Sequence, residues 1–348
     1  MKQLFCATAH PHEDEDGSVY NLGFGYDNNI GLAYVITQIP PKTAEDGEGE
    51  KPLNGAKVLA TLPATSRQAY SHSFGMTKKY FIFIEQPLTV NLWKLAASRF
   101  VGWSILDTFS WDTTKSSTFH LISRETGEVV SKFTADPFFF FHVVNAYETN
   151  GDVIIDLCCY QDSKSFNLLY LDEIRNPGNA TKEKNTNFPC HMRRYCLPVE
   201  DAKESPEFTL PKQPTGLDHD RVCESSIELP RINEKYNRLP HRFVYGVCSN
   251  KDGVDGLKLK RLIKVDVESK KSNIWSEEGC LVSEPVFIPA PDSEQEDDGV
   301  VLSAVCDPEK EKSFLLVLDG KTFTEVGRAE VPIRFAPSLH GRFIMGTK

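Results

Sequence analysis

Short runs of β-branched and aromatic residues recur along the chain, and they constrain its fold more than any other feature. Five of these runs are bounded by turn residues: Tyr80–Ile84, Val153–Leu157, Phe243–Val247, Val300–Val305 and Phe314–Leu318. Runs of this length and composition predict β-strands. Stretches with the 3.6-residue period of a helix are nearly absent, and the one good example runs from Leu92 to Trp103. The sequence therefore predicts an all-β fold.

A polar tight turn that ends in glycine precedes three strand-like segments. These turns are Glu15–Gly17, Thr149–Gly151 and Asp297–Gly299. Because glycine adopts positive φ without a steric penalty, we expect positive φ at each of the three glycines. A four-stranded propeller blade takes about 40–50 residues, so each of the two intervals between these turns is long enough for about three blades. This spacing favours a β-propeller over a sandwich, since radial closure removes long exposed sheet edges.

Three polar stretches, 40–52, 176–189 and 290–299, predict loops. The last of them carries a run of carboxylates that includes Glu294 and Glu296–Asp298. Carboxylate clusters can bind a hard cation. A run of charge at a turn is also typical of a solvated hairpin tip, which is the interpretation that we favour.

The composition excludes several classes of protein. The 348 residues include 49 acidic and 39 basic ones, for a net charge of −10, so we expect no nucleic-acid partner. No run of 18 or more apolar residues exists that would predict a membrane-spanning helix, and Met1–Phe5 lacks the features of a secretory signal. The nine cysteines lack C-x-x-C spacing, which predicts free thiols in a reducing compartment.

Four of the nine histidines lie in unusual sequence contexts: His10, His72, His142 and His340. No local metal motif has such wide spacings, but separate propeller blades can each direct one residue to a common axis. Neutral imidazole suits iron, copper, nickel and zinc, and the lack of carboxylates in these contexts disfavours calcium and magnesium. Each histidine taken alone could equally be a core or surface residue. His142 follows four phenylalanines, so it would need polar partners if it were buried.

Motifs around and between these histidines occur together in one known family. They are Ala9–His12 with Asp16–Gly17, Ser71–Thr77, Phe83–Pro87, Phe141–His142 with Asn145–Glu148 and Asp156–Leu157, Arg193–Tyr195, Glu228–Asn233, Ser283–Phe287, Glu296–Ser303, and Phe323–Glu330 with His340–Gly341. In this order, over essentially the whole chain, the sequence resembles the carotenoid cleavage oxygenases. Within the animal branch of β-carotene dioxygenases and the retinal pigment epithelium isomerohydrolase, it is more similar to the dioxygenases.

The resemblance implies a seven-bladed β-propeller that binds Fe(II) through four histidines. The residues at those positions are His10, His72, His142 and His340, and His12 is a second polar residue of the first motif. Glu228 and Glu284 match family glutamates that are hydrogen-bonded to ligand imidazoles. A carboxylate that accepts the far N–H of an imidazole fixes the ring and increases its basicity as a ligand.

The implied reaction is oxidative cleavage of a conjugated double bond in a carotenoid or apocarotenoid by O2, which gives two carbonyl products. Phe74 and Phe138–Phe141 are candidates to line a tunnel for the polyene, or alternatively ordinary core residues. Residues 92–103 match a region that contacts the membrane in related proteins. Leu92, Leu95, Ala96, Phe100 and Trp103 would share one helical face, so either membrane contact or packing of that face against the fold is expected.

The sequence departs from the family pattern in two places. Val143 stands where the family usually has a second histidine, and only nine residues precede the first ligand motif, where the family has a long segment. We therefore expect a single β-propeller domain over 1–348 that lacks the N-terminal blades and retains about five. We also expect poor turnover by the isolated chain, and an intracellular protein, cytoplasmic or mitochondrial, at a membrane surface.

Two other functions remain open at this stage. The chain could be a catalytically impaired carotenoid- or retinoid-binding fragment, or it could be a retinyl ester isomerohydrolase. Iron content and turnover discriminate between these alternatives and the dioxygenase.

Overall fold

Antiparallel sheets make up most of the computed structural model, which describes residues 2–41, 55–64, 67–175, 190–199, 215–249, 259–336 and 338–344. The predicted loop 176–189, and all but the first two residues of the predicted loop 40–52, lie outside these residues. The chain forms two compact units. Unit 1 comprises residues 1–141 and 197–218, and unit 2 comprises residues 142–196 and 219–348.

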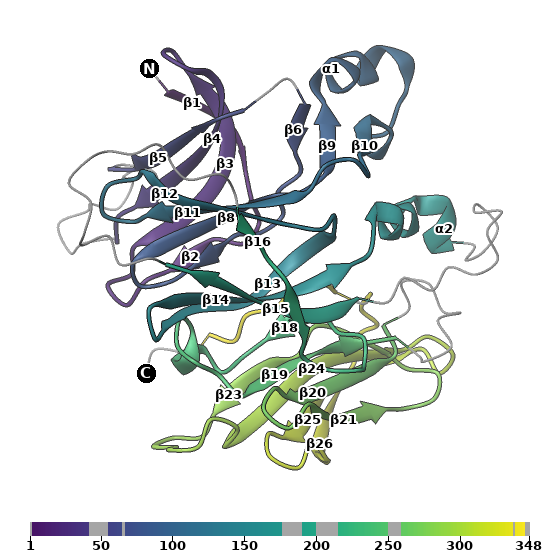
Figure 1. The fold of residues 1–348 in the computed structure, drawn as a ribbon. Coiled ribbons are helices and arrows are strands. Elements are labelled where there is room, and N and C mark those ends of the chain that lie inside the picture. Colours follow the sequence, from purple (N-terminus) through teal and green to yellow (C-terminus); the bar gives the residue numbers. More distant parts are fainter. Residues whose placement is uncertain are drawn as a thin grey trace. The chain divides into compact units, whose positions relative to one another are not determined.

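Unit 1 contains two larger sheets and one small sheet (Figure 1). The first sheet has the order β1 (Lys2–Ala7), β3 (Val19–Asp27), β4 (Gly31–Ile39), β5 (Lys57–Pro63), with β2 (His12–Glu13) paired to β3. The second has the order β16 (Thr215–Gly216), β12 (Val129–Ala135), β11 (Ser117–Ser123), β8 (Tyr80–Glu85), β7 (Gly75–Met76). The small sheet has the order β10 (Phe109–Trp111), β9 (Leu88–Asn91), β6 (Arg67–Ala69).

The remaining three sheets contain the strands from β13 onward, apart from β16. Their orders are β13 (Phe139–Thr149), β14 (Asp152–Tyr160), β15 (His191–Pro198), β17 (His219–Arg221); then β18 (Glu228–Arg231), β19 (Phe243–Cys248), β20 (Arg261–Asp266), β21 (Lys271–Ser276); and β22 (Leu281–Val282), β24 (Gly299–Asp307), β25 (Lys312–Asp319), β26 (Glu325–Val331), with β23 (Val286–Pro289) paired to β24. The helical segments are α1 (Leu92–Val101), α2 (Leu171–Arg175), η1 (Leu106–Thr108), η2 (Ser163–Leu169) and η3 (Glu234–Tyr236).

These sheets confirm the prediction of an all-β, blade-like fold. The described residues contain five sheets of four or five strands, and most neighbours within a sheet follow one another along the chain, as in propeller blades. All five predicted strands are present, within β8, β14, β19, β24 and β25. A single propeller domain over 1–348 stays a prediction.

The cores of the two units are made by the same residue types that predicted the strands. In unit 1, Leu22, Ile36, Phe74 and Phe81 are at most 1% exposed and belong to one cluster. A second cluster in unit 2 joins residues from β13 to β20, including Met192 and Ile263. Burial of such side chains contributes about 1.5–3 kcal/mol each, so strand positions in both units are fixed mainly by apolar packing.

The three turn glycines do not have the same role. Gly17 has φ 82° and Gly151 has φ 85°, as expected for tight turns. The expectation of positive φ is wrong for Gly299, which is the first residue of β24. A Cβ atom at Gly299 would collide with the carbonyl oxygen of Ile288 on the paired strand. Glycine is needed there because two backbones approach closely, not because of a turn conformation.

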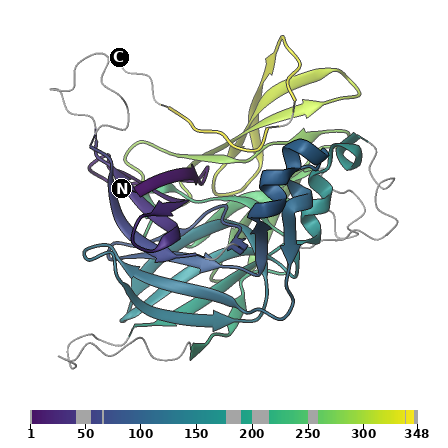
Figure 2. The same ribbon diagram turned by 90° about the horizontal axis from the view of Figure 1, so that it is seen from above.

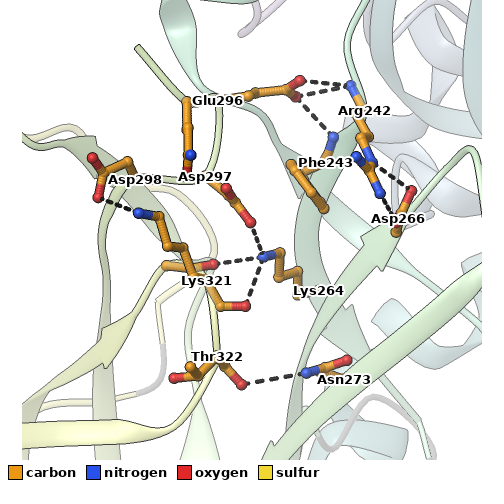
Figure 3. A network of polar contacts seen from close by, with 12 residues as sticks. Arg242, Phe243, Lys264, Asp266, Asn273, Glu296, Asp297, Asp298, Lys321 and Thr322 are labelled. Atoms are coloured by element: carbon orange, nitrogen blue, oxygen red, sulfur yellow. Dashed lines mark hydrogen bonds and ion pairs between the residues drawn. The ribbon is translucent and has the colours of Figure 1, made fainter. Parts of the chain in front are cut away.

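The acidic stretch 290–299 is the tip of the β23–β24 hairpin, as predicted, and Asp292 and Glu294 are exposed there, but Glu296 and Asp297 bind partners in other segments (Figure 3). The Glu296 carboxylate accepts hydrogen bonds from the backbone N–H groups of Arg242 (2.9 Å) and Phe243 (2.8 Å). The Asp297 carboxylate accepts one from Nζ of Lys264 at 2.6 Å. These partners lie far away in the sequence, so the charge run alone could not show that its carboxylates are occupied.

Helix α1 stands at the end of β9 and β10, where both ribbon views place it (Figures 1 and 2). The Asn91 side chain caps its first turn, and Gly102, with φ 72°, ends it. Leu92 and Leu95 are half-buried, but Trp93 is 80% and Phe100 is 90% exposed. Helix α1 ends at Val101, so Trp103 lies beyond the helix. The exposure of Trp93 and Phe100 contradicts the alternative of a helix buried against the fold, and membrane contact stays a prediction. Among the described residues, no helix has both the length and the apolar character to cross a bilayer.

Candidate functional site

In unit 1, two of the four histidines direct ring nitrogens at each other. His10 lies between β1 and β2, and His72 lies between β6 and β7. Their Nε2 atoms are 3.0 Å apart, and the ring centroids are 4.7 Å apart. Two ligands at about 90° around a metal, with metal–nitrogen bonds of about 2.1 Å, would also be about 3.0 Å apart. This pair therefore has the spacing of two ligands of one metal ion.

A tyrosine orients the second of these imidazoles. The Tyr70 hydroxyl lies 2.8 Å from Nδ1 of His72, and the two rings are stacked. Burial raises the pKa of Tyr70, so the phenol stays neutral. When Nδ1–H of His72 donates to this oxygen, the lone pair of the ring is on Nε2, which is the nitrogen that faces His10. His12 has a different role, because its Nε2 donates to the carbonyl oxygen of Phe74 at 2.8 Å.

In unit 2, each of the other two histidines is hydrogen-bonded to a carboxylate. His142 in β13 is 8% exposed, and its Nδ1 donates to Oε2 of Glu228 at 2.6 Å. His340, in the segment after β26, donates from Nδ1 to Oε1 of Glu284 at 3.0 Å. The two imidazole centroids are 5.2 Å apart, with the rings nearly perpendicular. Donation from Nδ1 to a carboxylate again puts the ring's lone pair on Nε2.

Both carboxylates are held by further donors. The backbone N–H of Leu229 donates to Oε2 of Glu228 at 2.6 Å, and the backbone N–H of Gly341 donates to Oε2 of Glu284 at 3.1 Å. Burial alone would raise the pKa of Glu228, but the His142 imidazole and the donors around the carboxylate outweigh burial and lower it. Glu228 is therefore ionised at neutral pH. The Arg231 guanidinium lies 3.8 Å from Glu284 and balances part of its charge.

The donor set of the two pairs fits a transition metal. Imidazole is an intermediate ligand that suits Fe(II) and its neighbours in the first transition row, and it disfavours calcium and magnesium. The glutamates contact imidazole N–H groups, so they can compensate the charge of a bound divalent cation without occupying a coordination position. The four histidines singled out in the sequence thus form one pair in each unit, and both glutamates contact the pair in unit 2.

Two functional candidates were not found from the sequence. Tyr70 is two residues before His72, and that spacing is a signal that could have been used, since alternate residues of an extended segment share a face. The phenol of Tyr160 is among the groups that lower the pKa of the Glu228 carboxyl. It comes from a different strand, β14, and its sequence context gave no hint of this effect.

Comparison with known proteins gives consistent results. A family model described as "Retinal pigment epithelial membrane protein" matches residues 1–345. The mitochondrial carotenoid-cleaving dioxygenase of Mustela putorius furo is 39% identical over 97% of this chain and 66% of that protein. The Homo sapiens protein of the same name is 37% identical over 97% of this chain and 61% of its own length.

A second group of relatives carries a different name. The β,β-carotene 15,15'-dioxygenase of Rattus norvegicus is 36% identical over 97% of this chain and 62% of that protein. This chain thus spans less than two thirds of the length of each of these relatives.

Solved structures show the same fold. A variant of the apocarotenoid oxygenase of Synechocystis has a TM-score of 0.74 and 21% identity, over 98% of this chain and 65% of that one. The cobalt-substituted form of the Synechocystis protein matches with the same TM-score, identity and coverage. At this level of identity, the likeness shows the fold alone.

Proposed function

Because the chain belongs to the retinal pigment epithelial membrane protein family, we propose that it is a non-haem Fe(II) dioxygenase. Its reaction would cleave a conjugated double bond of a carotenoid or apocarotenoid with O2 and give two carbonyl products. The observation that carries the proposal is the presence of two imidazole pairs in which three of the four rings have a hydrogen-bond partner at Nδ1. In one of these pairs, Glu228 and Glu284 each accept a hydrogen bond from a ring N–H.

In this proposal, the four histidines bind one iron ion: His10, His72, His142 and His340. Each offers one ring nitrogen as a ligand atom. Four neutral ligands leave the charge of Fe(II) at +2, and Glu228 and Glu284 compensate it from outside the coordination sphere. Bound Fe(II) would supply the centre at which O2 is activated. The protein's own residues set the orientation of the rings, and metal binding requires each ligating imidazole to be neutral.

An apolar polyene needs an apolar surface beside the metal, and unit 1 offers one. The Phe141 ring lies 5.3 Å from that of His72 and 4.6 Å from that of Phe139. Phe138–Phe140 are at most 1% exposed, as is Phe74, so these four are core residues. Phe141, which is half-buried, is the aromatic residue that we propose for substrate contact. A ring face there could stabilise cationic character on the polyene.

The exposed side chains of helix α1 support contact with a membrane surface. Trp93 and Phe100 are exposed, and so are Val101, Trp103 and Ile105, which follow them. Tryptophan and phenylalanine on one side of a short helix favour insertion into the headgroup boundary of a bilayer. A carotenoid dissolves in lipid, so extraction from a membrane would begin at such a contact. We propose an intracellular site of action, cytoplasmic or mitochondrial, with peripheral membrane association.

The test is reconstitution of the 348-residue chain with Fe(II), followed by incubation with carotenoids and apocarotenoids in air. Iron content and aldehyde products are measured, with the His142→Ala variant as the control. Because we expect poor turnover by the isolated chain, the expected result is bound iron with slow, metal-dependent aldehyde formation, both of which the variant lacks. Bound iron and bound carotenoid without products would favour the binding-fragment alternative, and release of retinol from retinyl esters would favour the isomerohydrolase. A chain that binds no iron would contradict the proposal.

A further inference from the structure

The segments of unit 1 that carry His10 and His72 contact each other at a second point beyond the two imidazoles. Nε2 of His12 lies 2.8 Å from the carbonyl oxygen of Phe74, and the two rings pack edge to face with centroids 4.7 Å apart. This contact joins residues that are 62 positions apart, as does the contact between the imidazoles. The two segments therefore lie side by side in one fixed register.

Arg124, the residue after β11, binds both segments just beyond these contacts. Its Nη2 donates to Oδ2 of Asp14 at 2.6 Å, and its Nη1 donates to the carbonyl oxygens of Thr77 at 2.9 Å and Lys78 at 3.0 Å. Asp14 follows β2 and Thr77 follows β7. The planar guanidinium presents several donors in a fixed fork, so it can hold a carboxylate and two carbonyl groups at once.

The core of unit 1 holds the Arg124 side chain in this place. Its guanidinium lies 4.8 Å from the ring centroid of Tyr20 on β3 and 5.5 Å from that of Phe81 on β8. These strands belong to the two larger sheets of the unit. The Arg124 side chain is 14% exposed and that of Asp14 is 22% exposed. A charge-assisted hydrogen bond that is largely shielded from water is stronger than an exposed one.

We infer that Arg124 is a positioning residue that holds the two segments together and thereby sets the spacing of His10 and His72. This inference rests on the proposed function, because it gives both histidines the role of metal ligands. Neither histidine lies in a strand, so their spacing depends on contacts outside the sheet ladders. A metal ion binds more tightly to ligands that are already held in place, because less ordering accompanies binding.

The main test is the variant Arg124→Met, which keeps a long side chain and removes the donors. Cobalt(II) is the probe, since its visible absorption reports ligand geometry and its affinity can be measured against a chelator. We expect about 3–10-fold weaker cobalt binding and a changed absorption spectrum. Arg328→Met in unit 2 is the matched control, since Arg328 donates to Glu277 at 2.7 Å and to Glu325 at 2.6 Å and also lies over an aromatic ring. It should leave affinity and spectrum unchanged.

A double variant tests whether Arg124 acts by joining the two segments. Asp14→Ala breaks the same link from the other side, so alone it should weaken cobalt binding in the same direction. It also serves as the test if Arg124→Met folds poorly. In the Asp14→Ala background, Arg124→Met should weaken cobalt binding little further, because the link is already broken. Fully additive effects of the two substitutions would overturn the inference.

Hydrogen exchange of the metal-free chain gives a readout that does not depend on metal binding. Because Arg124 binds both segments, Arg124→Met should speed exchange in peptides that cover residues 10–18 and in those that cover residues 72–80. Arg328→Met should change neither set of peptides. Unchanged exchange of both segments in Arg124→Met would contradict a role in holding them together.

The outcomes separate this inference from the proposed function. If the wild-type chain binds neither cobalt nor iron, the proposed function fails, and hydrogen exchange alone then decides whether Arg124 holds the two segments. If the wild-type chain binds cobalt and Arg124→Met matches it in affinity, spectrum and exchange, only the inference is overturned. Thermal unfolding of each variant shows whether a loss of affinity merely reflects a loss of folded protein.

Discussion

The two histidine pairs differ in what fixes their rings. In unit 2, His142 and His340 each donate to a carboxylate, whereas in unit 1 His72 faces the neutral hydroxyl of Tyr70. A carboxylate both orients an imidazole and attracts the positive charge of a metal ion, while a phenol only orients it. If the four histidines bind one ion as proposed, unit 2 supplies the two carboxylates that would stabilise its charge. The partner that orients His72 in unit 1, Tyr70, is neutral.

The largest expected effect is the loss of bound iron when a proposed ligand is removed from either unit. His72→Ala and His142→Ala remove one proposed ligand from each unit. If all four histidines bind one ion, both variants should lose bound iron, with affinity reduced by about 100-fold or more, beyond the loss of an outer partner. The measurement is iron per chain after reconstitution. His191→Ala, at a half-buried histidine beside Arg221, is the control. Full iron content in His72→Ala would show that unit 1 does not share the ion.

The next largest effect is on metal affinity when either carboxylate partner in unit 2 is neutralised. Glu228→Gln and Glu284→Gln should each weaken metal binding by about 10–100-fold. The loss should be greater for Glu228, because its contact with His142 is 2.6 Å against 3.0 Å for Glu284 with His340, and because the His340 side chain is 39% exposed. Glu330→Gln, at an exposed residue near Lys312, should bind metal like the wild type. If Glu228→Gln and Glu284→Gln both bind metal with unchanged affinity, the two carboxylates do not contribute to metal binding.

A third histidine in unit 2 extends the comparison to stability. His241 lies 3.3 Å from the buried Asp156, and Asn145 donates to its Nδ1. Burial lowers the pKa of His241 despite the nearby carboxylate. The unfolded chain, with an imidazole pKa of about 6.5, therefore takes up a proton before the folded chain does. Stability present above this pH is lost as the pH falls below it, by at most about 1.4 kcal/mol per pH unit.

Urea unfolding at pH 7.5 and pH 5.5 measures this effect. The loss of stability on acidification should be smaller in His241→Gln than in the wild type, whatever the stability of the variant at pH 7.5. An equal loss in both proteins would mean that His241 is protonated in the folded chain.

The smallest effect concerns the neutral partner in unit 1. Tyr70→Phe removes one hydrogen bond between uncharged groups, which is worth about 0.5–1.5 kcal/mol. We expect metal affinity to fall about 2–10-fold, less than for Glu228→Gln. Chelator competition gives both values in one experiment. If Tyr70→Phe is as harmful as Glu228→Gln, the distinction between charged and neutral partners is wrong.

The sequence predicted what depends on local pattern and missed what depends on distant partners. The strands within β8, β14, β19, β24 and β25 were predictable because their apolar runs are long enough to identify them. The resemblance to the carotenoid cleavage oxygenases is confirmed by the family and the relatives. Tyr160 and the partners of the acidic hairpin were missed, since nothing in one segment shows which segment will pack against it.

Prediction from one segment also failed at helix α1. Its apolar residues predict burial or a membrane by the same pattern, and only the structure distinguishes an exposed Phe100 from a packed one. Gly299 was misread for a related reason, because the neighbour that requires glycine there is the carbonyl of Ile288 on β23.

The paired carboxylates of the β23–β24 hairpin change how the charge of this protein acts at a distance. Lys264 is 5% exposed and donates to Asp297 and to two backbone carbonyls, and Lys321 lies 3.1 Å from Asp298. Two of the negative charges at the tip are therefore cancelled within a few ångströms, and their field decays as that of dipoles. A diffusing cation approaching this tip would experience far less attraction than four acidic residues within five positions suggest.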